Sequence, residues 1–445
     1  MALIKLKRGY DMDLAGKLPD NEAIAELPLS KTVAVVPDDF SGLIPRMEKK
    51  AGDRVVIGEP LYHDKNAESI KVTAPVSGTV KEVRRGERRK IEAVVIEPDG
   101  RQECREFDVK RPADELLLES GLWAQMRQRP YDIVPVPGRR PRDIVVTAFD
   151  SAPLAPNLIT LLGDDLKYVA PGLEALATLT DGNVLVGLRP EQQLDVPDGI
   201  VTNEFAGPHP AGNAGVQLAN IRPVNKGETV WTLDIITVAR LGKLLKTGHL
   251  DTSAIVAVTG SETEPALVKT VQGQEIATLL EGRLKDNDTE RRIISGNVLT
   301  GVKVEADGFL RAPYRQLTVI PEVLNNAEFM GWATLSPRKF SVYRDFLGTL
   351  FGTNKKNKRL DAKINGGERA IVLSGEYDRM LPMDILSEFL IKAIIARDID
   401  KMEQLGIYEV APEDFALAEM ACTSKLELQR IVREGLTYLQ SEMGN

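Results

Sequence analysis

The sequence predicts a multidomain protein of mixed α/β and α+β class, and three observations carry this prediction. At 445 residues the chain is too long for one hydrophobic core. Residues 37–100 hold short strand patterns broken by turns, the middle alternates β-branched runs with helical stretches, and the part after residue 384 shows amphipathic helical faces. We therefore expect four parts, at residues 1–103, 104–260, 261–335 and 336–445.

The composition excludes several classes of protein. Hydrophobic residues make up 43% and charged residues 27%, which are ordinary globular values. No apolar run approaches the roughly 18 residues of a spanning helix, so we expect no transmembrane segment of its own. The opening MALIKLKRGYDMDLAGK lacks the apolar core of a secretory signal, which favours a cytoplasmic location. A net charge of −8 argues against a nucleic-acid partner.

The cysteines and histidines predict no metal centre. The two cysteines, Cys104 and Cys422, are too few for a four-cysteine zinc or iron–sulfur site. The chain has three histidines, and none has a second histidine three or four residues away. Two local basic clusters are interpreted either as solvated turns or as a surface for an anionic lipid or partner. They consist of Arg84, Arg85, Arg88, Arg89 and Lys90, and of Lys355, Lys356, Lys358, Arg359 and Lys363.

A small all-β module is predicted between Pro37 and Gly100. Gly52, Gly58 and Gly78 mark turns between short strand patterns. The combination of KxGDxVxxGxPL with TAPVSGTV resembles the barrel-sandwich modules of biotinyl and lipoyl carrier domains. In such carriers a lysine at a hairpin tip carries the prosthetic group, and Lys65 is the lysine near that place. Two interpretations stay open: a structural sandwich with a solvated lysine, or a carrier modified at Lys65.

A doubly wound, Rossmann-like α/β core is predicted next. The runs Ile144–Ala148, Val184–Leu188 and Ala254–Thr259 are typical of buried parallel strands. A helix with apolar residues from Ile235 to Leu245 would end at Gly248. The phosphate-binding patterns GxGxxG and GxxxxGK[ST] are absent, so the sequence predicts the scaffold of a nucleotide-binding domain without its nucleotide-binding loop.

The remaining chain predicts a smaller α+β unit and a helical end. Residues 268–320 fit a β-grasp module, with a helix over 274–284 and a closing strand in LRAPYRQLTVIPE. In the last part, Ser424 and Glu427 have the spacing of a capping box for the final helix. We expect the apolar faces of these helices to pack on one another.

The loop Gly207–Gly215, GPHPAGNAG, is the candidate site. Its prolines and glycines forbid a regular element, and the apolar run after it fits a helix face. The loop is therefore predicted to lead into a helix N-terminus, where unpaired N–H groups can meet an electronegative ligand atom. The alternative interpretation is a tight connection between packed elements.

Segments along nearly the whole chain resemble, in order, one family: NqrA, the A subunit of the Na⁺-translocating NADH:quinone oxidoreductase. They include MALIKLKRGYDMDLAGK, TAPVSGTVKEVRRGERR, GPHPAGNAG, RRIISGNVLTG, INGGERAIVLSGEYDRMLPMDIL and ACTSK. The resemblance implies a peripheral, cytoplasmic member of a bacterial inner-membrane complex that docks on the membrane-embedded B subunit. That complex passes electrons from NADH through flavins and an iron–sulfur centre to ubiquinone or menaquinone and exports Na⁺.

The family is also distantly similar to the NADH-binding subunit of complex I and to the C subunit of Rnf complexes. These relatives share a Rossmann-like core, a soluble-ligand-binding β-grasp (SLBB) module and a helical tail, and they carry FMN and tail cysteines that hold iron–sulfur clusters. Here the tail offers Cys422 alone. The resemblance therefore implies a chain that holds no flavin or cluster itself, and that is not catalytic when isolated.

The resemblance also suggests an involvement with quinone, the substrate of the complex. His209 and the backbone of Gly212 and Gly215 are candidates for its polar end, and Phe205 and Trp231 are candidates for apolar walls. Two alternatives from other classes remain: a carrier protein modified at Lys65, and a stand-alone NADH dehydrogenase.

Overall fold

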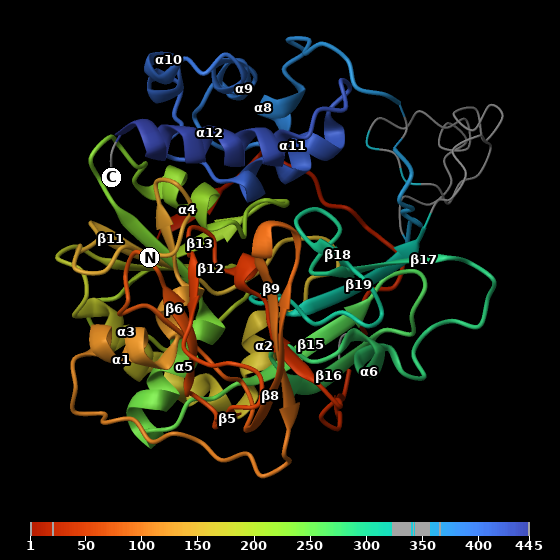
Figure 1. The fold of residues 1–445 in the computed structure, drawn as a ribbon. Coiled ribbons are helices and arrows are strands. Elements are labelled where there is room, and N and C mark those ends of the chain that lie inside the picture. Colours follow the sequence, from red (N-terminus) through yellow and green to blue (C-terminus); the bar gives the residue numbers. More distant parts are fainter. Residues whose placement is uncertain are drawn as a thin grey trace.

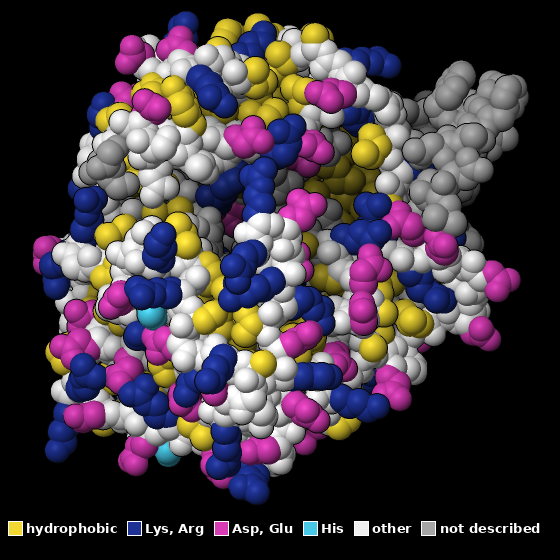
Figure 2. Space-filling model, in the orientation of Figure 1, with side chains coloured by type: hydrophobic (Ala, Val, Ile, Leu, Met, Phe, Trp, Pro, Cys, Tyr) yellow, Lys and Arg dark blue, Asp and Glu magenta, His cyan; other side chains and the backbone are white. Residues whose placement is uncertain are grey.

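The structure is a computed structural model, and it describes residues 2–19, 22–322, 340, 342, 357–364 and 366–443. The predicted boundary between residues 335 and 336 lies outside the described residues, as do Lys355 and Lys356 of the second basic cluster. Two six-stranded sheets and a β module form the body, and the C-terminal helices lie across one end of it (Figure 1). The space-filling view shows a hollow beneath those helices (Figure 2).

The first sheet is mainly parallel, and its strands β11, β12 and β14 are almost completely buried. Its strands, in spatial order, are β1 (Ala2–Lys5), β13 (Val201–Ala206), β12 (Val184–Leu188), β11 (Asp143–Thr147), β14 (Val230–Asp234) and β10 (Arg127–Arg129). Only β10, at one edge, is antiparallel to its neighbour. The chain steps outward from β11 through β12 to β13 and then returns to the other side of β11 as β14. That reversal is the topological switch point, beside which open α/β sheets bind their ligands.

Helices cover both faces of this sheet. Successive side chains of β11 point to opposite faces and are apolar on both, so each face needs a covering layer. Ile144 and Val146 share a core with the helices on one face, and Val145 packs with Leu218 on the other. The first face carries α2 (Leu158–Leu162), α3 (Val169–Ala177) and α5 (Ile235–Thr247), and the second carries α4 (Ala214–Ile221). The predicted end of α5 is confirmed, because Gly248 adopts a left-handed conformation with φ 71°.

The second sheet has the order β18, β17, β19, β15, β16, β2. Its strands are β2 (Ile24–Glu26), β15 (Ser253–Thr259), β16 (Ala266–Val271), β17 (Arg291–Ser295), β18 (Val302–Val304) and β19 (Gln316–Pro321), and α6 (Ile276–Leu280) packs on it. The assignment of residues 254–259 to the first sheet was wrong. β15 pairs with β16 and β19 instead, and a buried β-branched run looks the same in either sheet.

The N-terminal β module consists of two small sheets around one core. One has the order β3 (Val33–Val35), β9 (Ile91–Pro98), β8 (Gly78–Arg85), β5 (Arg54–Val55), and the other β4 (Pro45–Met47), β6 (Pro60–Asp64), β7 (Lys71–Thr73). Its core is continuous with that of the first sheet through α1 (Ala113–Ser120) and Trp123. The module is therefore packed onto the α/β part and does not hang free.

The C-terminal helices are α8 (Glu376–Met380), α9 (Ser387–Ile395), α10 (Ile399–Gln404), α11 (Ala416–Ala421) and α12 (Leu428–Met443). They share one core with Phe205 and Val216 of the α/β part. The predicted capping box was wrong, because α12 begins only at Leu428 and the Ser424 hydroxyl donates to Ala370 O at 2.9 Å. Among the described residues, we find no helix with the length and apolar character to cross a bilayer.

Candidate functional site

The loop predicted as a site lies at the carboxyl ends of the parallel strands. Ser151 follows β11, and His209 and Gly212 follow β13. The Gly212 N–H donates to Ser151 Oγ at 2.8 Å, and the same oxygen lies 3.0 Å from His209 Nδ1. Arg189, which follows β12, donates to Gly207 O at 2.6 Å. The structure thus brings His209 and Gly212 together through Ser151, at the edge where α/β sheets place ligands.

His209 is a neutral, enclosed side chain. It is 3% exposed, and its backbone N–H donates to Asp11 at 2.8 Å. Burial lowers the pKa of His209 to about 4, and the nearby Arg189 charge acts in the same direction. Ser151 Oγ already accepts the Gly212 N–H, so its own hydrogen is available for His209 Nδ1. The other ring nitrogen, Nε2, has no partner among the described residues.

The N-terminus of α4 is covered by a carboxylate of the same chain. A Cβ added at Gly215 would lie 2.5 Å from Asp414 Oδ2 and 2.9 Å from Arg129 Nη2. Asp414 belongs to the short 3₁₀ helix Pro412–Phe415, which precedes α11. The helix N-terminus attracts an anion, and here the approaching anion is Asp414. Sequence reasoning missed this contact, because Asp414 lies 199 positions further along the chain and no local pattern marks it.

The two predicted apolar walls lie in different cores. Phe205 is 0% exposed on β13 and packs in the core shared with the C-terminal helices. Trp231 is 2% exposed on β14, where its ring meets Trp123 edge-on with centroids 4.9 Å apart. Trp231 therefore belongs to the core beneath α5 and not to the loop.

The crevice at the switch point is occupied by the second sheet. Arg315, just before β19, places Nη2 3.5 Å from the carboxylate of Asp234, which ends β14. Gln316 Nε2 donates to Pro153 O, in the loop after β11, at 3.1 Å. Residues at the start of β19 thus contact the loop after β11 and the end of β14, where a nucleotide would bind in a doubly wound fold.

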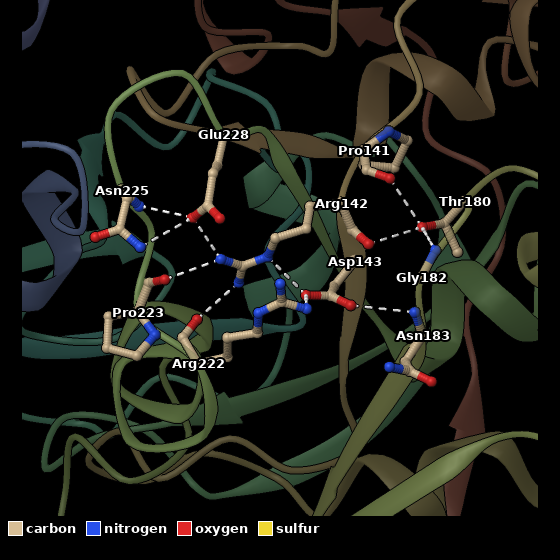
Figure 3. Close-up of polar contacts among 10 residues, drawn as sticks. All are labelled: Pro141, Arg142, Asp143, Thr180, Gly182, Asn183, Arg222, Pro223, Asn225 and Glu228. Carbon is tan, nitrogen blue, oxygen red and sulfur yellow. Dashed lines mark hydrogen bonds and ion pairs between the residues drawn. The ribbon is translucent and has the colours of Figure 1, made fainter.

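The opposite, amino ends of the strands carry a dense polar network that serves structure (Figure 3). Arg142 Nε donates to Asp143 at 2.8 Å, and its Nη1 donates to Glu228 at 2.5 Å. Asp143 also accepts the Asn183 N–H at 3.1 Å. The network ties the start of β11 to the start of β12 and to the loop before β14. It lies away from the edge where ligands bind.

Lys65 and the two cysteines lie outside the loop Gly207–Gly215. Lys65 is exposed in the loop between β6 and β7, where its N–H donates to Ile44 O at 2.8 Å. Cys422 is buried with its sulfur 2.9 Å from Tyr377 Oη, and Cys104 is partly exposed in the segment that leaves the β module. Within the described part of the chain, no group of three His, Cys, Asp or Glu side chains is arranged to hold a metal ion.

Sequence reasoning also missed a cavity between three parts of the chain. The cavity has a volume of about 50 Å³ and lies between the β module, α1 with the following turn, and the second sheet. Its apolar walls include Val72, Leu122 and Leu250, and its polar groups include Asp39 and Gln272. The Gln272 Nε2 has no partner among the described residues. Apolar walls with a few polar groups are typical of a small-molecule site, but such sites usually have a volume of about 300 Å³ or more, so this cavity would have to widen to admit a ligand.

Asp39 is one of the carboxylates that line this cavity, together with Asp251. It lies in the 3₁₀ turn Pro37–Asp39, and its side chain is 5% exposed. Burial raises the pKa of Asp39 to about 7, against the opposing charge of Arg311, whose Nε donates to it at 2.5 Å. The Ala312 N–H donates to the other oxygen at 2.8 Å. No local signal distinguishes Asp39 from Asp38, because the partners that bury it lie more than 270 residues away.

Comparison with protein families identifies the class of protein. The description "NqrA N-terminal barrel-sandwich hybrid domain" matches residues 4–99, "NqrA second alpha/beta domain" matches 110–250, and "NQRA C-terminal domain", an SLBB model, matches 255–306. The predicted barrel-sandwich module and SLBB-like module are thereby confirmed. The fold and these matches define a multidomain protein of the NqrA class.

Curated relatives match over the whole chain. The A subunit of the Na(+)-translocating NADH-quinone reductase of Serratia proteamaculans is 38% identical over 99% of this chain and 100% of its own. The protein of the same name from Rhodopirellula baltica is 37% identical over 99% of this chain and 99% of its own. The one from Yersinia pestis bv. Antiqua is 35% identical over 99% of this chain and 100% of its own. The chain belongs to this family, the A subunits of Na(+)-translocating NADH-quinone reductases.

Among solved structures, a chain of an NAD⁺-reducing nickel–iron hydrogenase in the air-oxidized state is 12% identical. The match covers 68% of this chain and 55% of that chain, with a TM-score of 0.34. A likeness of this size supports no statement about fold or function.

Proposed function

We propose that this chain is the peripheral A subunit of a Na⁺-translocating NADH:quinone reductase, on the cytoplasmic side of a bacterial inner membrane. The observation that carries the proposal is the 38% identity to a protein of that name over 99% of the chain. In this proposal the chain docks on the membrane-embedded B subunit and supports the passage of electrons from NADH to ubiquinone or menaquinone coupled to Na⁺ export. No observation favours the carrier or the stand-alone dehydrogenase.

The proposal includes the division of the chain at residues 103 and 335, with the boundary predicted at 260 moved to before β15, which begins at Ser253, and a Rossmann-like identity for the first sheet. The strand order β13, β12, β11, β14 supports that identity. The proposal also assigns the flavins and the iron–sulfur centre to other subunits of the complex. The contacts of Arg315 and Gln316 at the switch point support this part, because they occupy the place of a nucleotide.

A contribution to quinone binding is the finer part of the proposal. His209, Phe205 and Trp231 are at most 3% exposed, so a quinone would reach them only if the packed core opened. The cavity beside Asp39 has apolar walls and a Gln272 amide whose Nε2 has no partner among the described residues, but at about 50 Å³ it would have to widen to admit a quinone ring. In this proposal quinone contact therefore requires either the loop Gly207–Gly215 or the cavity to open.

The test of the function is deletion and complementation in a host that makes the complex. Membranes from the deletion strain should lose Na⁺-dependent quinone reduction by NADH, and expression of this chain should restore it. Full activity without the chain would refute the proposal. Stoichiometric flavin absorbance in the purified chain would refute the part that assigns flavins to other subunits.

A photoreactive quinone analogue on the assembled complex tests the finer part. Labelled peptides covering residues 34–40 and 120–125 would place the quinone at the cavity. Labelling confined to residues 205–215 would favour the loop. Labelling found only on the other chains of the complex would remove quinone contact from this chain.

A further inference from the structure

The tip of the hairpin formed by β8 and β9 is strongly basic and only partly neutralised. Arg84 pairs with Glu82 at 3.0 Å and Lys90 pairs with Asp38 at 2.6 Å. The other three cations of the tip are exposed and have no ion pair among the described residues; they are Arg85, Arg88 and Arg89. We call these three side chains the arginine tip. Two carboxylates lie at this end of the hairpin, Glu87 in the turn and Glu92, whose side chain packs against Gly86.

The backbone of the arginine tip is held in a costly conformation. Arg88 has φ 53° and Arg89 has φ 62°, so two adjacent residues with side chains occupy the left-handed region. That region costs roughly 1 kcal/mol for each residue that is not glycine. The turn is closed by Gly86 N–H to Lys90 O at 2.9 Å and by Lys90 N–H to Glu87 O at 3.0 Å. Arg85 Nη1 also donates to Arg89 O at 3.1 Å across the turn, whereas the side chains of Arg88 and Arg89 form no ion pair among the described residues. Strain at two such exposed side chains points to a role outside the fold.

The arginine tip stands at the edge of a concave surface. In Figure 1 the hairpin rises toward the C-terminal helices, and its tip ends beneath α11 and α12. In Figure 2 Lys and Arg side chains gather over this end of the hairpin, next to the hollow under the helices. A flat bilayer does not enter a hollow, whereas an extended peptide does. Guanidinium groups bind carboxylates through two parallel hydrogen bonds, which a point charge cannot form.

We propose that the arginine tip docks an acidic peptide segment of another subunit, laid into the hollow between the hairpin and the C-terminal helices. The segment supplies carboxylates to Arg85, Arg88 and Arg89, which pair with none among the described residues. This inference rests on the proposed function, because it takes the partner from the same membrane complex. Charge attraction of this type speeds docking and weakens as salt rises.

The test uses the full chain and membranes from a strain that makes the other subunits but lacks this one. Purified wild-type chain is added, the membranes are sedimented, and the bound fraction is measured. The variant Arg88→Glu with Arg89→Glu should bind about tenfold more weakly, the effect expected for loss of a charged, paired contact. The matched control reverses Arg8 and Arg139, two exposed arginines on other loops that also lack an ion pair in the described structure. It should bind within about twofold of wild type.

A second variant separates folding from binding. Arg88→Gly with Arg89→Gly removes both charges and relieves the left-handed strain, so it should unfold at the same temperature or higher and still lose binding. Equal binding by wild type and both tip variants would overturn the inference. If wild type itself fails to bind the membranes, the proposed function fails, which is a different result.

Protein-free vesicles of phosphatidylglycerol and phosphatidylethanolamine distinguish the lipid alternative. The wild-type chain should not sediment with them. A soluble polyglutamate peptide should displace the chain from the membranes that contain the other subunits, because it offers the carboxylates that the arginine tip binds. Vesicle binding that disappears in Arg88→Glu with Arg89→Glu would overturn the acidic peptide in favour of lipid phosphate.

Discussion

Arg129 Nη1 lies 2.8 Å from Asp414 Oδ2, and the two side chains are 1% and 0% exposed. Arg129 ends β10 of the first sheet, and Asp414 precedes α11. The same guanidinium donates to Glu409 O at 3.2 Å and to Glu413 Oε1 at 3.0 Å. Across the same boundary Arg433 of α12 donates to Tyr131 O at 2.9 Å. Arginines from both sides therefore hold the C-terminal helices on the α/β part.

Arg129→Met should strongly destabilise the protein. The substitution leaves the Asp414 carboxylate buried without its cation, which costs about 3 to 5 kcal/mol. Urea unfolding should show this loss, and Arg129→Met combined with Asp414→Leu should recover much of it. The control is Arg430→Met, which breaks pairs of α12 whose side chains are at least 58% exposed and should cost at most about 1 kcal/mol. Equal costs for the two arginines would contradict the burial argument.

Gly215→Ala should separate Arg129 from Asp414. The added Cβ would lie 2.5 Å from Asp414 Oδ2, so the carboxylate must move, and we expect a loss of about 1 to 3 kcal/mol. Gly367→Ala is the matched control, because nothing lies within 4 Å of its added Cβ. Its change in unfolding free energy should stay within about 0.5 kcal/mol. A tolerated Gly215→Ala would mean that the α4 N-terminus accommodates the extra methyl group.

Because His209 is buried in its neutral form, the free energy of unfolding should fall at acidic pH. The pKa of His209 is lowered from 6.5 to about 4, so between these values the unfolded chain binds a proton that the native chain does not. Its contribution is complete above pH 6.5 and is lost as the pH falls through 4. His209→Asn should reduce the fall in unfolding free energy between pH 7.5 and pH 4.5 by about 2 to 3 kcal/mol. The exposed His249→Asn serves as control, and an unchanged profile for His209→Asn would exclude a buried neutral ring.

Tyr62→Phe should leave stability unchanged or raise it by about 1 kcal/mol. The Tyr62 side chain is fully buried, and its hydroxyl has no hydrogen-bond partner among the described residues. The native state therefore bears the cost of removing this hydroxyl from water without a hydrogen bond in return, and the substitution removes that cost. Tyr314→Phe provides the contrast, because that hydroxyl donates to Thr300 O at 2.8 Å. It should cost about 1 kcal/mol in the same thermal unfolding experiment. A clear loss for Tyr62→Phe would indicate a bound water at its hydroxyl.

The sequence could predict elements whose signal is local. The strand runs at 144–148 and 184–188, the α5 cap at Gly248 and the loop that leads into α4 all depend on neighbouring residues. The features that the sequence could not predict depend on contacts between residues far apart in the chain. The partner sheet of residues 254–259, the Asp414 carboxylate over Gly215 and the cavity around Asp39 each join residues far apart in the chain. Periodicity carries no information on such partners.

The pairing of the first strands has a consequence for synthesis of the protein on the ribosome. β1 is a parallel partner of β13, and β2 is a parallel partner of β16, so residues 2–5 and 24–26 await segments made some two hundred residues later. At about 5 to 20 residues per second, these strands stay unpaired for roughly ten seconds or more after they leave the exit tunnel. A chaperone that shields nascent strand edges would therefore act on the beginning of this chain for about half of its translation.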